Sequence, residues 1–178
     1  KDFLEDIKAN AAVTGEGSCA SFVAEFARYL QEADYLLDFT ESYFEGIGTR
    51  NRRLRVDGYA YDEFDKTMSL IIADYDGFDD GRVLGQTQAK QLQDRLTYFV
   101  DDSLNTQLYR EIEMSRASSD LVDFLREMRS EIRKYILLIF TTANVSTRIT
   151  TLESNDIDGV STECQIWDIE RLFKVCGS

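Results

Sequence analysis

Apolar side chains recur along this chain at two spacings, which divide it into helices and strands. Over residues 18–32 they fall three and four positions apart, the period of one helical face, and Ser18 suits the N-cap of such a helix. Residues 54–61 and 68–75 are strand-like runs separated by a short polar segment, and 40–48 is a weaker run before them. These segments predict a helix followed by a three-stranded antiparallel meander.

The second half of the chain predicts further helices and strands. A stripe of apolar positions indicates a long helix over 86–112, and Ser119 is a candidate N-cap for another helix. Residues 135–142 form a continuous apolar run with β-branched ends, typical of a strand covered on both faces, and we expect it at the centre of the sheet. A last strand over 162–167 precedes a short helix that starts at Asp168. The fold class that this order predicts is α/β.

Length and composition place the chain among globular proteins. Its 178 residues, 43% of them hydrophobic, are enough for one domain with a sizeable core. The longest apolar run is too short to cross a bilayer, which needs about 20 residues, and the amino end lacks the apolar core of a signal peptide. We therefore expect a cytoplasmic protein without membrane contact. Because the chain lacks an initial methionine and stops directly after a patterned segment, we expect residues 1–178 to be a single domain of a longer protein.

Charge and residue types restrict the chemistry. With 20 Lys and Arg against 33 Asp and Glu, the net charge is −13, which disfavours nucleic acid as a partner at long range. The basic cluster Arg50, Arg52, Arg53 and Arg55 is either a solvated turn or a phosphate contact. The absence of histidine excludes Ser-His-Asp and Cys-His catalysis and most zinc enzymes. Hydrolytic chemistry would depend on carboxylates with a hard metal, or on lysine.

Two aspartates form a candidate metal site. If the hairpin closes tightly around Asp65 and Lys66, Asp57 lies directly across from Asp74 on one face. Carboxylates at that distance repel each other unless a cation or a proton lies between them, and Mg²⁺ prefers such oxygen ligands. The alternative is a pair of solvated strand acids, and a register slip of one residue would separate them. If the acids do face one another, Asp57→Asn should stabilise the metal-free domain.

Four short stretches carry a resemblance to a known family. They are VDGY at 56–59, LIIADY at 70–75, IFTTAN at 139–144 and IWDIERL at 166–172. Together they resemble the amino-terminal domain of the AIPR family, the abortive-infection phage-resistance proteins of bacteria, over most of the chain. The element order is also that of a restriction-endonuclease-like core: helix, three-strand antiparallel meander, helices, buried central strand, final strand and short helix.

The resemblance implies a PD-(D/E)xK-like fold, in which an Asp on the second strand and an acid on the third bind metal. The second acid is followed two residues later by a catalytic Lys. Asp57 matches the first acid and Asp74 the second, but Asp76 stands at the lysine position and Val56 replaces the Pro. An acid at position 76 reverses the local field that would stabilise negative charge.

In some relatives of the fold the lysine comes from the following helix, where Lys90 is the candidate, and either Lys90 or Gln86 would assist cleavage. The alternative for Lys90 is an ordinary exposed helix lysine. Two hypotheses follow. The first is a degenerate nuclease domain that serves as an interaction or sensing module for the remainder of the protein or for a protein partner. The second is a nuclease that uses Mg²⁺ or Mn²⁺, Asp57, Asp74 and Lys90 to cleave DNA or RNA.

Overall fold

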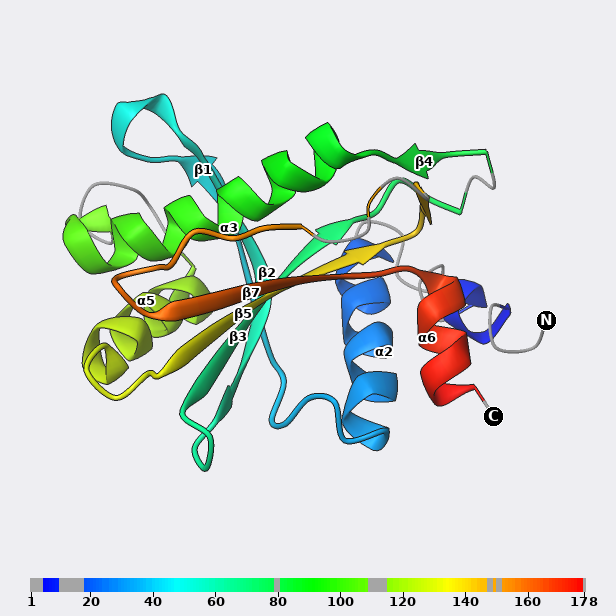
Figure 1. Ribbon diagram of the computed structural model, residues 1–178, viewed down its shortest axis with the longest axis horizontal. Coiled ribbons are helices and arrows are strands. Elements are labelled where there is room, and N and C mark those ends of the chain that lie inside the picture. The colour runs from blue at the N-terminus through cyan, green and yellow to red at the C-terminus, as the bar shows by residue number, and fades with distance from the viewer. Residues whose placement is uncertain are drawn as a thin grey trace.

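A five-stranded mixed sheet with helices on both faces forms the centre of the molecule (Figure 1). The computed structural model describes residues 5–9, 18–78, 81–108, 115–146, 149 and 152–177. The strands lie in the order β1 (Thr40–Ile47), β2 (Arg53–Asp62), β3 (Thr67–Asp74), β5 (Lys134–Thr141) and β7 (Ser161–Trp167). Strand β2 is antiparallel to both neighbours, whereas β3, β5 and β7 run parallel. The predicted α/β class is confirmed.

Two apolar cores lie on opposite faces of this sheet, because successive strand residues point to alternate sides. Helices α3 (Gln86–Asn105) and α5 (Arg116–Met128) cover the face to which Ile72 and Ile139 contribute. Helices α2 (Ser18–Glu32) and α6 (Ile169–Cys176) lie next to each other on the face of Ala73 and Phe140 (Figure 1). Helix α2 before the meander and helices α3 and α5 after it therefore cover different faces, and the last helix, α6, returns to the face of α2.

Most predicted elements lie where the apolar pattern places them. Helix α2 and strands β1, β2, β3 and β7 occur within two residues of expectation, and Asp168 caps α6 by accepting a hydrogen bond from the Arg171 N–H at 2.8 Å. Strand β5 is interior, as predicted, but β3 rather than β5 occupies the middle of the sheet. The predicted helix over 86–112 is too long, since α3 ends at Asn105; residues 109–114 lie outside the described part.

Two further differences concern local structure. Helix α5 begins at Arg116, capped by Ser115 and not by Ser119, because the Ser115 hydroxyl accepts a hydrogen bond from the Ser118 N–H at 3.2 Å. Strands β4 (Val83–Leu84) and β6 (Asn144–Val145) form a small parallel sheet that the sequence pattern did not predict. Across the described residues, no helix has the length and apolar character that a membrane crossing requires.

Candidate functional site

The β2–β3 hairpin has a wider turn than predicted, which changes the position of the two aspartates. Its last backbone pair is Asp62 with Thr67, and the turn contains four residues. The Asp62 carboxylate stabilises this turn by accepting hydrogen bonds from the N–H groups of Phe64 at 2.9 Å and Asp65 at 3.3 Å. The register is shifted by two residues relative to the tight turn. The predicted direct pairing of Asp57 with Asp74 is therefore wrong.

Asp57 is buried on the α2 side of the sheet, at the point where β2 and β3 separate. Regular pairing of the two strands stops at Gly58 and Ile71, and the Asp57 carboxylate accepts the Ala73 N–H at 2.8 Å. It thereby satisfies a backbone donor that has no strand partner at this point. Arg55 donates to the same carboxylate from Nε at 3.1 Å and Nη2 at 3.2 Å.

Burial raises the pKa of Asp57 above its ordinary value, and the Arg55 guanidinium opposes this only in part. Arg55 also contacts the Glu45 carboxylate at 3.2 Å and the Cys19 sulfur at 3.7 Å. A cavity of about 340 Å³ adjoins this cluster, lined by Tyr43 and by residues of α2. Burial raises the pKa of the Cys19 thiol as well, so Cys19 is held as a neutral thiol and is a poor nucleophile.

Asp74 lies at the carboxyl end of β3 and connects three segments. Its carboxylate accepts hydrogen bonds from Arg82 Nη1 and from the Thr141 hydroxyl, both at 2.7 Å. Its backbone carbonyl accepts from Arg82 Nη2 and from the Thr142 N–H, both at 3.1 Å. These contacts hold the ends of β3 and β5 against the segment that leads into β4.

The two carboxylates point to opposite faces of the sheet. Asp74 lies two positions after Ile72, and its partner Thr141 lies two positions after Ile139, so this pair faces the α3 side. Asp57 instead lines its cavity together with Val23 and other α2 residues. The fold therefore does not bring the two predicted metal ligands to one cavity.

Lys90 lies on α3 and is engaged there. Its ammonium group lies 3.0 Å from the Asp94 carboxylate and 3.2 Å from Gln93 Oε1, and its side chain is 46% exposed. Both contacts are local to the helix, at positions three and four residues later. Asp76 and Gln86 are exposed. Within the described ranges, no cluster of three or more His, Cys, Asp or Glu side chains is placed to hold a metal ion.

The sequence analysis missed Arg82, and it named Arg55 in the basic cluster but not as the partner of Asp57. Arg55 precedes Asp57 by two positions on the same strand, so its side chain lies on the same face, and this spacing is a signal that could have identified the pair. Arg82 lies in the loop after β3, and no sequence pattern connects it with Asp74. Each candidate acid is therefore paired with an arginine side chain of this chain.

The fold and these contacts define an α/β domain whose two motif-matched acids are neutralised by arginines. The family model described as the abortive infection phage resistance protein N-terminal domain matches residues 22–174. The chain therefore belongs to this family. Neither the search of curated proteins nor the search of solved structures found a match.

Proposed function

We propose that this chain is a degenerate PD-(D/E)xK-like domain that acts as an interaction or sensing module in abortive-infection phage defence. Membership of the family supports the defence role. The order of helix, antiparallel meander, helices and parallel strands supports a restriction-endonuclease-like ancestry. Asp57 and Asp74 remain at the positions that match the two acids of that motif.

The observation that carries the proposal is the separation of those two acids. Cleavage of a phosphodiester by this type of site requires carboxylates that share a metal ion, with a cation near the reacting phosphate. Here Asp57 and Asp74 face different sides of the sheet and each is paired with an arginine. Asp76 stands where the lysine is expected, and Lys90 is paired with Asp94. A metal ion would have to displace these contacts before it could bind both acids.

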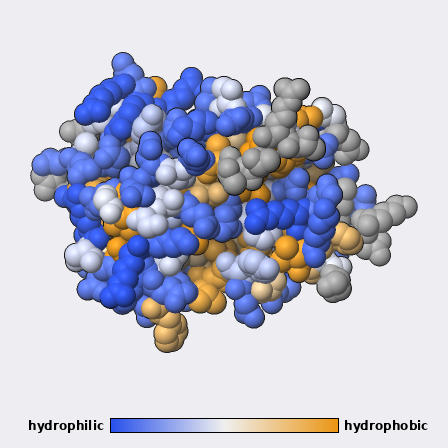
Figure 2. Space-filling view, in the orientation of Figure 1, coloured by the Kyte–Doolittle hydropathy of each residue, from blue (hydrophilic) through white to orange (hydrophobic). Residues whose placement is uncertain are grey.

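Exposed apolar side chains support the interaction role. Phe64, at the tip of the β2–β3 hairpin, is 94% exposed, and Tyr35 and Leu37 are also exposed. Figure 2 shows apolar side chains at the lower edge of a mainly hydrophilic face, where the hairpin projects in Figure 1. Tyr35 and Leu37 line a hollow together with Asp62 and Asp65 of the hairpin. We propose that this surface binds protein, either the remainder of a longer chain or a separate partner.

A calorimetric titration with Mg²⁺ and Mn²⁺, combined with cleavage assays on DNA and RNA, tests the proposal. We expect the addition of either metal to release the same heat with the wild-type chain as with the Asp57→Asn variant. We also expect neither protein to cleave DNA or RNA. The alternative function is an active nuclease that uses Mg²⁺ or Mn²⁺ with Asp57, Asp74 and Lys90. Metal binding and cleavage that are both lost in Asp57→Asn would establish that alternative and overturn the degenerate assignment.

A further inference from the structure

Internal contacts account for two of the four arginines in the basic cluster at 50–55, whereas the side chains of Arg50 and Arg53 form no ion pair or hydrogen bond among the described residues. Arg52 binds the carboxylates of α3, and Arg55 binds Asp57 and Glu45. Arg53 has no ion pair or hydrogen bond from its side chain among the described residues, and the same holds for Arg95 of α3. No carboxylate among the described residues therefore neutralises the guanidinium groups of Arg53 and Arg95.

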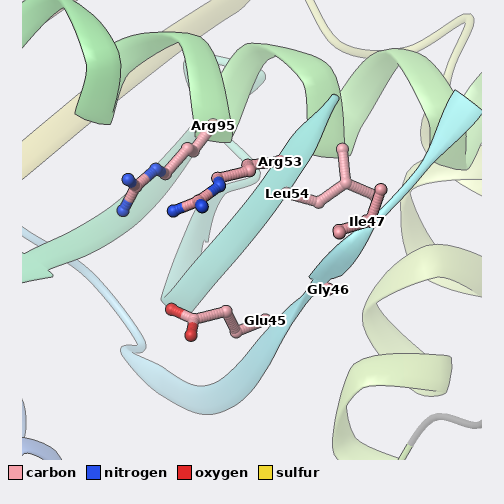
Figure 3. Close-up of a pocket in the computed structure, with 6 residues that line it drawn as sticks. All are labelled: Glu45, Gly46, Ile47, Arg53, Leu54 and Arg95. Atoms are coloured by element: carbon pink, nitrogen blue, oxygen red, sulfur yellow. The ribbon is translucent and has the colours of Figure 1, made fainter. Parts of the chain in front are cut away.

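Arg53 and Arg95 line one cavity. It has a volume of about 380 Å³ and lies where the end of β1, the start of β2 and helix α3 meet. Figure 3 shows the two arginine side chains extending in the same direction, with the Glu45 carboxylate separate from their guanidinium groups. Ile47 supplies exposed apolar surface, and the buried Leu54 lies beneath it. The cavity therefore combines two cations, one hydrogen-bond acceptor and apolar surface.

A buried network fixes α3 against the start of β2 and so holds the backbones that carry the two arginines. Asp102 of α3 is 1% exposed and accepts hydrogen bonds from the Thr49 N–H at 2.8 Å and from Arg52 at 2.6 Å. Arg52 also contacts Asp101 at 2.8 Å and lies over the Tyr98 ring at 4.5 Å. Because Arg52 directly precedes Arg53, this network fixes the backbone of Arg53 relative to α3 before any ligand arrives, and the exposed Arg53 side chain is ordered only on binding.

We propose that this cavity binds a small phosphorylated molecule of the nucleoside monophosphate class. Guanidinium groups form planar, charge-assisted hydrogen bonds with phosphate oxygens, so Arg53 and Arg95 hold the phosphate. Ile47, which is 60% exposed, contacts the apolar face of the base, and Glu45, which also pairs with Arg55, accepts hydrogen bonds from hydroxyl or amino groups. The volume lies within the range of about 300–1,000 Å³ typical of small-molecule sites. The net charge opposes the approach of a long polyanion, which favours a small ligand over a nucleic-acid strand.

This inference does not depend on the degenerate assignment of Asp57 and Asp74, and its test is made in EDTA so that metal binding cannot contribute. The 178-residue chain is titrated calorimetrically with adenosine 5′-monophosphate, uridine 5′-monophosphate, inorganic phosphate, adenosine and a single-stranded oligonucleotide. We expect both monophosphates to bind, inorganic phosphate to compete with them, and adenosine to show no binding. Arg53→Gln and Arg95→Gln should each weaken monophosphate binding about tenfold or more.

Arg133→Gln is the matched control, because it removes the same charge from an exposed position just before β5, outside the cavity. We expect its affinity to stay within about twofold of wild type, since it removes only long-range charge that salt screens. Absence of monophosphate binding, or equal weakening by all three variants, would overturn the proposal. Tighter binding of the oligonucleotide than of either monophosphate would replace the small-molecule assignment by a nucleic-acid contact.

Discussion

Asp57 and Asp74 each accept hydrogen bonds from an arginine, but their carboxylates are buried to different extents. Asp57 is 5% exposed, and the loss of solvation raises its pKa in spite of the Arg55 contact. Asp74 is 21% exposed and lies at a strand end. The reason first given for a stabilising Asp57→Asn change, repulsion by Asp74, does not apply because the acids face different sides. Burial of the Asp57 charge is a separate reason to expect that Asp57→Asn stabilises the fold.

The pH dependence of stability should therefore differ between wild type and Asp57→Asn. A raised pKa means that the folded state holds the Asp57 proton more strongly than the unfolded state, so the contribution of Asp57 is complete below its ordinary value of 3.8. That contribution is lost as the pH rises through the folded pKa. Urea denaturation from about pH 4 to about pH 7 should show a smaller loss of stability in Asp57→Asn than in wild type.

Asp57→Ala is the variant that separates charge from hydrogen bonding in this test. It removes the acceptor of the buried Ala73 N–H, an acceptor that asparagine retains, so we expect destabilisation by about 1–3 kcal/mol. Identical pH profiles for Asp57→Asn and wild type would show that burial of this carboxylate does not set the dependence.

The apolar pattern predicted which helices and strands exist better than it predicted the residues at which they begin and end. Helix α5 illustrates the reason: two serines, Ser115 and Ser119, precede apolar positions and each suits an N-cap. The structure selects Ser115, whose hydroxyl contacts the Ser118 N–H, and the Ser118 hydroxyl in turn donates to the Tyr43 carbonyl of β1. The helix start is thus determined by a contact with a strand more than 70 positions earlier, which sequence periodicity does not contain.

The two serines should respond differently to alanine substitution. Ser115→Ala removes the capping acceptor and should lower the free energy of unfolding by about 1 kcal/mol. Ser119→Ala lies within the first turns of α5, where alanine is well suited to the helix, and should change stability by less than about 0.5 kcal/mol. Chemical denaturation of both variants measures the difference. An equal loss in the two would mean that Ser115 does not act as the cap.

On the scale of the whole molecule, charge and exposed apolar surface argue for recognition of protein rather than of long nucleic acids. The net charge of −13 opposes polyanions. The mainly hydrophilic face in Figure 2 is interrupted by apolar side chains at the edge where the β2–β3 hairpin projects. Asp62 and Asp65 of that hairpin share a hollow with the exposed Tyr35 and Leu37. An apolar surface bordered by acids favours a partner with apolar and basic side chains.

A hairpin-tip variant tests this surface without disturbing the core. Phe64→Ser should lower phage protection by the full-length protein at unchanged protein level, because it removes the most exposed apolar side chain of the proposed interface. Val83→Ser is the control, since Val83 is also exposed, at 54%, but lies in β4 and not in the hairpin. A phage-challenge assay with both variants measures the effect. Equal protection by Phe64→Ser and wild type would exclude the hairpin tip as a required contact.

The sequence by itself determined the α/β class, the meander and most of the helices, because apolar periodicity reports which side of each element is buried. Only the tertiary structure decided how these elements meet. The capped four-residue turn set the β2–β3 register, and the separation of the strands at Asp57 placed the two candidate acids on opposite faces. Contacts such as Asp74 with Arg82, or the shared cavity of Arg53 and Arg95, join residues from different elements. Their geometry depends on strand order and helix packing, which no local pattern specifies.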